Sequence, residues 1–92
     1  RKRERAEQTR RDRELQARRS RLADLEARIA DRERAIAELE ATMAAPGFYE
    51  QRDAAQPVID RHQALMWEVG ELMHGWESLS EMLETERGQT VK

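Results

Sequence analysis

Residues 45–57 read APGFYEQRDAAQP, and this stretch interrupts a chain that is otherwise rich in arginine, glutamate, alanine and leucine. It contains both prolines of the sequence, and a glycine directly follows the first of them. Such residues end helices, because proline lacks an amide donor and glycine adopts conformations that other residues avoid. We therefore interpret residues of about 45–53 as a bend between two helices, with the rings of Phe48 and Tyr49 plugging its apolar end.

Before the bend, apolar residues follow a heptad pattern, which is typical of a coiled-coil helix. Two positions of its second row hold Arg18 and Arg32, whose long stems can pack at a seam while the guanidinium groups reach water. The pattern predicts one helix over residues 12–44. Its two rows are Leu15, Leu22, Ile29, Ile36 and Met43, and Arg18, Leu25, Arg32 and Leu39.

After the bend, a second seam follows at alternating steps of four and three residues, which predicts a helix over residues 54–86. We expect Gly88 to end it, because glycine is common just past helix ends. The seam residues are Val58, His62, Leu65, Val69, Leu72, Trp76, Leu79 and Leu83.

The two seams are of similar length, so the helices can fold back on each other, and each residue of one heptad row then faces a residue of the other row on the partner helix. This agreement favours an all-α fold, a two-helix antiparallel coiled-coil hairpin over residues 12–87. We expect the isolated domain to be monomeric rather than a dimerising coiled coil. Residues 1–11 would be a basic linker or helix extension, and residues 88–92 a frayed tail. We expect Trp76 to be buried in the seam. The predicted pairs are Met43–Val58, Leu39–His62, Ile36–Leu65, Arg32–Val69, Ile29–Leu72, Leu25–Trp76, Leu22–Leu79 and Arg18–Leu83.

Composition argues against a catalytic domain. The chain has 92 residues, of which 39% are charged and 4% aromatic, and it has no cysteine, which suits one small helical module. It has no glycine-rich phosphate loop, and His62 and His74 have no neighbours at metal-ligand spacing. We expect no catalysis, cofactor or metal.

No apolar run approaches the roughly 18 residues of a membrane span, so we expect no membrane contact and a cytoplasmic location. Because the sequence does not begin with methionine, we expect a piece of a longer protein.

Charge is distributed unevenly along the chain. Residues 1–21 hold ten Lys or Arg and four acids, a net charge of +6, and the remainder carries −8. Such a basic end can neutralise phosphates of DNA or RNA. The alternative is a solvated helix face with pairs such as Glu7–Arg11 and Glu14–Arg18. The candidate nucleic-acid-binding residues are Arg10, Arg11, Arg13, Arg18, Arg19 and Arg21.

Trp67 falls on the outermost position of the second helix, outside the seam. It lies next to a row formed by Ile59, Met66 and Met73, which the partner helix only skirts. These four residues are either a partly covered surface or a docking face for another domain or chain.

Two stretches resemble a known family. ELQARRSRLADLEARIADRERAIAELEATMAAPGFYEQ and LMHGWESLSEMLE are similar to the C-terminal domain of Uup-type ABC-F ATPases, over roughly residues 12–84. That family combines leucine heptads, a proline and a Phe-Tyr pair at the bend, and a returning Trp-Glu-x-Leu run. APGFYEQ departs from the pattern, because the family often has an acid beside the bend proline. The matching residues are Pro46, Phe48, Tyr49, Trp76, Glu77 and Leu79.

The resemblance implies an antiparallel coiled coil tethered behind two ATP-binding cassettes, with nucleic-acid binding or ribosome-linked work. ATP hydrolysis would then belong to the parent protein. Our first hypothesis is a non-catalytic accessory domain of an ABC-F ATP-binding protein that binds DNA, or RNA, through its arginine-rich end. The alternative is a protein-interaction module that docks onto the parent ATPase or the ribosome through the Trp67 face.

Overall fold

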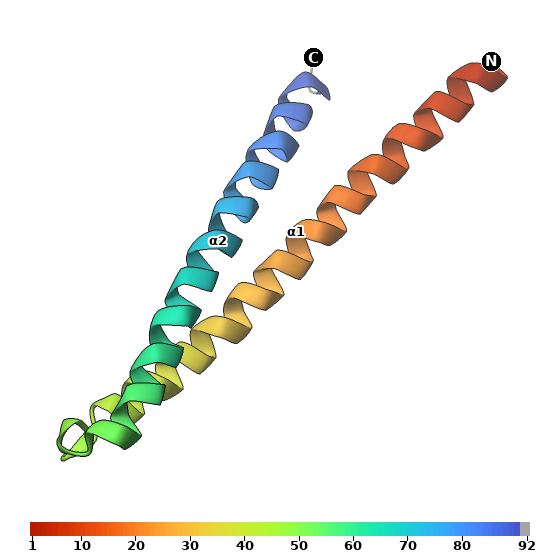
Figure 1. The fold of residues 1–92 in the computed structure, drawn as a ribbon. Coiled ribbons are helices and arrows are strands. Elements are labelled where there is room, and N and C mark those ends of the chain that lie inside the picture. The colour runs from red at the N-terminus through yellow and green to blue at the C-terminus, as the bar shows by residue number, and fades with distance from the viewer. Residues whose placement is uncertain (91–92) are drawn as a thin grey trace.

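The chain folds into two long antiparallel helices joined by a tight bend (Figure 1). The computed structural model describes residues 1–90. Helix α1 spans Lys2–Met43, helix α2 spans Arg52–Thr90, and a single turn of 3-10 helix, η1, spans Phe48–Glu50 between them. The molecule measures 72 × 22 × 14 Å. The predicted all-α hairpin is confirmed.

The bend is a type II turn followed by η1. The amide of Phe48 donates to the carbonyl of Ala45 at 3.2 Å, and Pro46 occupies the second position of the turn, where its fixed φ is favourable. Gly47 has φ 81° and ψ 1°, close to the ideal of about +80° and 0° for the third position. It is the only residue with a positive φ in the described chain. The Pro-Gly pair therefore reverses the chain directly after α1.

Both helices extend further than the heptads predict. Residues 2–11 are helical, because they are mostly arginine, glutamate, glutamine and alanine, which are good helix formers. The predicted stop at Gly88 is wrong, since α2 continues to Thr90. Gly88 lacks the positive φ that a glycine helix end requires. Residues 91 and 92 of the expected frayed tail lie outside the described residues.

The buried core is concentrated in the half of the hairpin nearest the bend. Ile36, Leu65 and Val69 form its centre, with Ala35 and Leu39 packed against them. Further toward the termini the two helices diverge (Figure 1), and the seam is only half-buried except at Leu79. The half-buried seam residues there are Leu15, Arg18, Leu22, Leu25, Ile29, Leu72, Trp76 and Leu83.

Contacts between the helices confirm the predicted register near the middle of the hairpin. The Arg32 Nε lies 2.8 Å from the Glu68 carboxylate, one residue from the predicted partner Val69. His62 lies 3.7 Å from Glu40, also one residue from its predicted partner. At the diverging end, by contrast, Arg18 pairs with Glu86, about one helical turn beyond the predicted Leu83.

Two rings are less buried than expected. Trp76 is half-buried, and its indole Nε1 donates to Glu26 Oε1 at 3.1 Å. Two helices alone cannot enclose an indole, so its polar edge stays at the border of the seam. Tyr49 is 65% exposed and packs edge-to-face on Phe48 with ring centroids 4.8 Å apart. Phe48 is half-buried but Tyr49 is not, so the expected two-ring plug is wrong.

Candidate nucleic-acid interface and docking face

The six candidate arginines all lie on α1 in the diverging part of the hairpin, but they do not share one face. Arg11, Arg18 and Arg19 line the groove between the two helices, whereas Arg10, Arg13 and Arg21 do not. At 100° per residue, these last three point to one outer flank of α1. The sequence placed four of the six in its predicted helix and left Arg10 and Arg11 in a linker or helix extension, whereas all six are helical and fall into an inner and an outer group.

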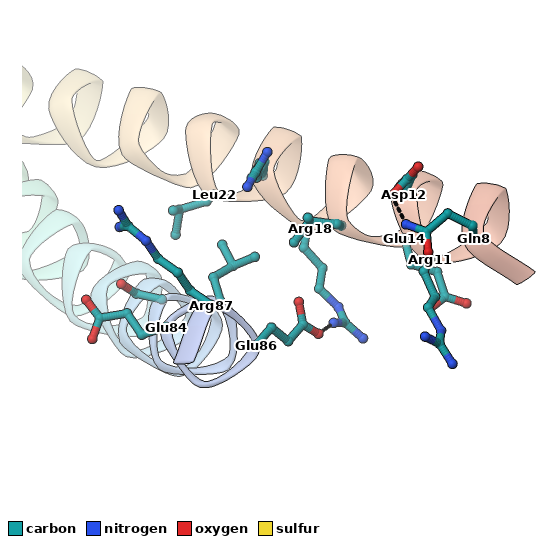
Figure 2. Close-up of a pocket in the computed structure, with 13 residues that line it drawn as sticks. Gln8, Arg11, Asp12, Glu14, Arg18, Leu22, Glu84, Glu86 and Arg87 are labelled. Atoms are coloured by element: carbon teal, nitrogen blue, oxygen red, sulfur yellow. Dashed lines mark hydrogen bonds and ion pairs between the residues drawn. The ribbon is translucent and has the colours of Figure 1, made fainter. Parts of the chain in front are cut away.

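The groove has a volume of about 1090 Å³ and a mixed lining (Figure 2). Leu15, Leu22 and Leu83 supply its apolar part. Four basic side chains are balanced by four acidic ones, so the groove carries no net charge and does not favour phosphate. The charged lining residues are Arg11, Arg18, Arg19 and Arg87, and Asp12, Glu14, Glu84 and Glu86.

Among the six candidate arginines, Arg18 alone forms an ion pair within residues 1–90. Arg18 is half-buried and pairs with Glu86 of α2. The spacings Glu7–Arg11 and Glu14–Arg18 form no ion pair within the described residues; instead the Gln8 side chain donates to Asp12 at 3.1 Å. The outer arginines are exposed and have no acidic partner in residues 1–90.

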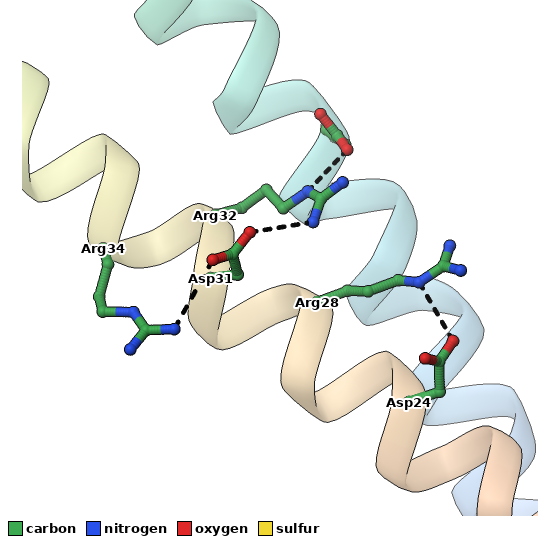
Figure 3. Close-up of polar contacts among 6 residues, drawn as sticks. Asp24, Arg28, Asp31, Arg32 and Arg34 are labelled. Carbon is green, nitrogen blue, oxygen red and sulfur yellow. Dashed lines mark hydrogen bonds and ion pairs between the residues drawn. The ribbon is translucent and has the colours of Figure 1, made fainter.

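Arginines further along α1 are held in a network (Figure 3). Asp24 pairs with Arg28 at 3.1 Å, and Asp31 pairs with Arg32 and Arg34 at 3.3 and 3.6 Å. These guanidinium groups are already neutralised locally. Apart from Arg18, the arginines of the first 21 residues have no carboxylate partner in the described chain, and those of the outer group also lie away from the acidic residues of the groove.

Arg3 was not among the candidates, although it belongs to the same flank. It lies seven residues before Arg10, is exposed, and forms no ion pair in the part of the chain that the structure describes. The seven-residue spacing in the sequence could have revealed it. We call Arg3, Arg10, Arg13 and Arg21 the outer arginine flank; it extends about 27 Å along α1 at 1.5 Å per residue.

The candidate docking residues lie on α2. Trp67 is 73% exposed, Met66 53% and Met73 41%, whereas Ile59 is half-buried beside the seam. The first three therefore form a continuous exposed surface, and Ile59 contributes at most its edge. Ala55 was missed by the sequence analysis although it is 3% exposed. It sits one heptad before His62, and that spacing could have placed it in the seam.

Other kinds of site receive no support. No cluster of three or more His, Cys, Asp or Glu suitable for a metal occurs in the described residues. None of the helices in this part of the chain is long and apolar enough to cross a membrane.

Comparison with known proteins agrees with the fold and with the resemblance found in the bend and the tryptophan run. The family model described as ABC transporter C-terminal domain matches residues 6–81, which is most of the chain. No curated protein and no solved structure gives a significant match. Because the family model covers most of the chain, the chain belongs to the ABC transporter C-terminal domain family.

Proposed function

We propose that this hairpin is a non-catalytic, nucleic-acid-binding accessory domain of an ABC-F ATP-binding protein. The observation that carries the proposal is the outer arginine flank, whose guanidinium groups are exposed and lack acidic partners in the described chain, whereas Arg18, Arg28, Arg32 and Arg34 are paired. Arginine binds phosphate well because its planar fork matches the phosphate oxygens.

The contact would be with the sugar-phosphate backbone rather than with bases. The flank has no aromatic side chain on which a base could stack. A single helix side carrying four arginines is expected to make about four phosphate contacts, which gives a log-log salt slope of about −3 to −4 on duplex DNA. Binding should be weak and should not depend on sequence.

Salt-dependent binding to a duplex oligonucleotide tests the proposal. Changing Arg10, Arg13 and Arg21 together to glutamine should weaken binding and reduce the slope by about 2 to 3. The control changes Arg34, Arg52 and Arg61 to glutamine, which removes the same charge from exposed positions nearer the bend. Equal losses in both variants would mean that only net charge matters, and the flank would not be the site. A parallel titration with duplex RNA establishes which nucleic acid binds better.

A further inference from the structure

Three large apolar side chains on α2 surround an open stretch of backbone. Met66 lies four residues before Gly70, Trp67 three residues before it, and Met73 three residues after it. All three are therefore neighbours of Gly70 on the helix surface. A Cβ built on Gly70 would meet nothing within 4 Å. We call this surface the Trp67 patch.

The fold does not explain the Trp67 patch. Trp76 on the same helix lies at the seam and donates a hydrogen bond to Glu26 of α1, while Trp67 lies outside the seam and remains largely exposed. Glycine inside a helix costs about 1 kcal/mol relative to alanine, and no neighbouring atom requires it at position 70. Large exposed apolar surfaces of this kind mark contact sites, and tryptophan is the residue most enriched at binding hot spots.

The border of the patch is acidic on both helices. On α1, Glu26 and Glu40 contact Trp76 and His62, which are the seam residues adjoining Met73 and Met66 on α2. Glu33 lies midway between those two glutamates at seven-residue spacing and is exposed. On α2, Glu71 and Glu77 follow Trp67 and Met73 by four residues each, and both are exposed.

No lysine or arginine lies on this border within the described residues. Arg61 is the lysine or arginine nearest in sequence to the patch, and it lines a separate small pocket together with Ala35 and Leu65 on the other side of the seam. The border is therefore complementary to a basic partner and repels phosphates. The basic arm of a second copy does not fit the patch, because residues 1–14 contain no apolar side chain larger than alanine.

We propose that the Trp67 patch docks a basic amphipathic helix of a partner protein, whose apolar side covers Trp67 and the two methionines while its Lys or Arg side chains reach the acidic border. Methionines suit such a surface because their flexible side chains adapt to a helical partner. The inference does not depend on nucleic-acid binding, because the outer arginine flank and the patch share no residue.

A synthetic helical peptide with leucines on one face and lysines elsewhere is the test ligand, and a version with every lysine replaced by glutamate is its control. Calorimetry with the full chain measures affinity. Fluorescence of the Trp76→Phe variant, in which Trp67 is the only indole, reports whether that ring becomes buried, once circular dichroism has shown that the variant is folded.

We expect the lysine peptide to bind and to shift the fluorescence emission of Trp67 to shorter wavelength. The Trp67→Ala variant should bind this peptide about tenfold or more weakly. Charge reversal by Glu33→Lys with Glu71→Lys should weaken binding several-fold. Tyr49→Ala removes another exposed ring, at the bend, and should change nothing. The change of Arg10, Arg13 and Arg21 to glutamine should not weaken peptide binding, whatever it does to DNA.

Three outcomes would overturn the proposal. The glutamate peptide could bind as tightly as the lysine peptide, or Trp67→Ala could bind the lysine peptide unchanged. Alternatively, sedimentation could reveal a dimer of the unmodified chain that Trp67→Ala converts to monomer, in which case a second copy of the chain occupies the patch.

Discussion

Arg32 of α1 reaches across the seam to Glu68 of α2, with its Nε 2.8 Å from the carboxylate. The arginine occupies a seam position one helical turn from Ile36, at the edge of the buried core. Both side chains remain partly exposed, 31% and 41%, so water screens the pair and its net contribution to stability is small.

Replacing Arg32 by leucine should therefore raise the free energy of unfolding by about 1 kcal/mol, because the added apolar burial outweighs the lost pair. Urea denaturation followed by circular dichroism measures this. Arg34→Leu is the control, since Arg34 lies exposed outside the seam, and it should change stability by less than about 0.5 kcal/mol. A loss for Arg32→Leu would mean that the ion pair contributes more than its exposure suggests.

The two tryptophans should differ in their effect on stability. Trp76→Ala removes a half-buried indole and its hydrogen bond to Glu26, and we expect a cost of about 2 to 3 kcal/mol, below the 3 to 5 typical of buried rings. Trp67→Ala should cost less than about 0.5 kcal/mol. Thermal unfolding of the two variants provides the comparison, and equal costs would place Trp67 in the core.

Alanine substitution should have opposite effects on stability at Gly47 in the bend and at Gly70 on α2. Gly70→Ala should stabilise the protein by about 0.5 to 1 kcal/mol, because a Cβ there meets only open space and alanine favours the helix. Gly47→Ala should destabilise it by about 1 kcal/mol or more, because the turn requires its φ of 81°. Midpoints of urea unfolding measure both, and a stabilising Gly47→Ala would contradict the type II turn.

Stability should be unequal along the seam. Leu65 is 2% exposed within the core cluster, so Leu65→Ala should cost about 2 to 4 kcal/mol. Leu15 lies half-buried where the helices diverge, and Leu15→Ala should cost less than about 1 kcal/mol. Native-state hydrogen exchange gives an independent measure: amides of α1 before residue 22 should exchange well before those around Ile36. Uniform protection along α1 would show that the diverging end is as stable as the core.

Much of the fold could be predicted because heptad spacing specifies which side chains face the partner helix. That is why Arg32 and His62 have partners within one residue of those expected. Spacing does not specify how far apart the helices run. The exposure of Trp76, the shifted partner of Arg18 and the groove between the helix ends all depend on that separation, so they could not be read from the sequence.

The candidate sites were predictable to a similar degree. The charge count located the basic end of α1, and helix periodicity could have separated its inner and outer arginines. Which of them find a carboxylate depends on the position of α2, because Glu86 neutralises Arg18 across the groove. Trp67 was assigned to the outside of α2 from its place in the heptad alone, since no seam position needed it. The acidic border of the Trp67 patch could be located only from the register between the two helices, because its glutamates lie on both of them.

The joining of two long helices at one short turn makes the hairpin a lever. Each arm is about 60 Å long at 1.5 Å per residue, so a change of 10° in the angle between the arms moves their tips by roughly 10 Å. Small differences in packing around the turn of Pro46 and Gly47 are thus magnified at the far end, where the outer arginine flank lies. A molecule bound at the far end would therefore move much further than the residues of the turn whose repacking causes the motion.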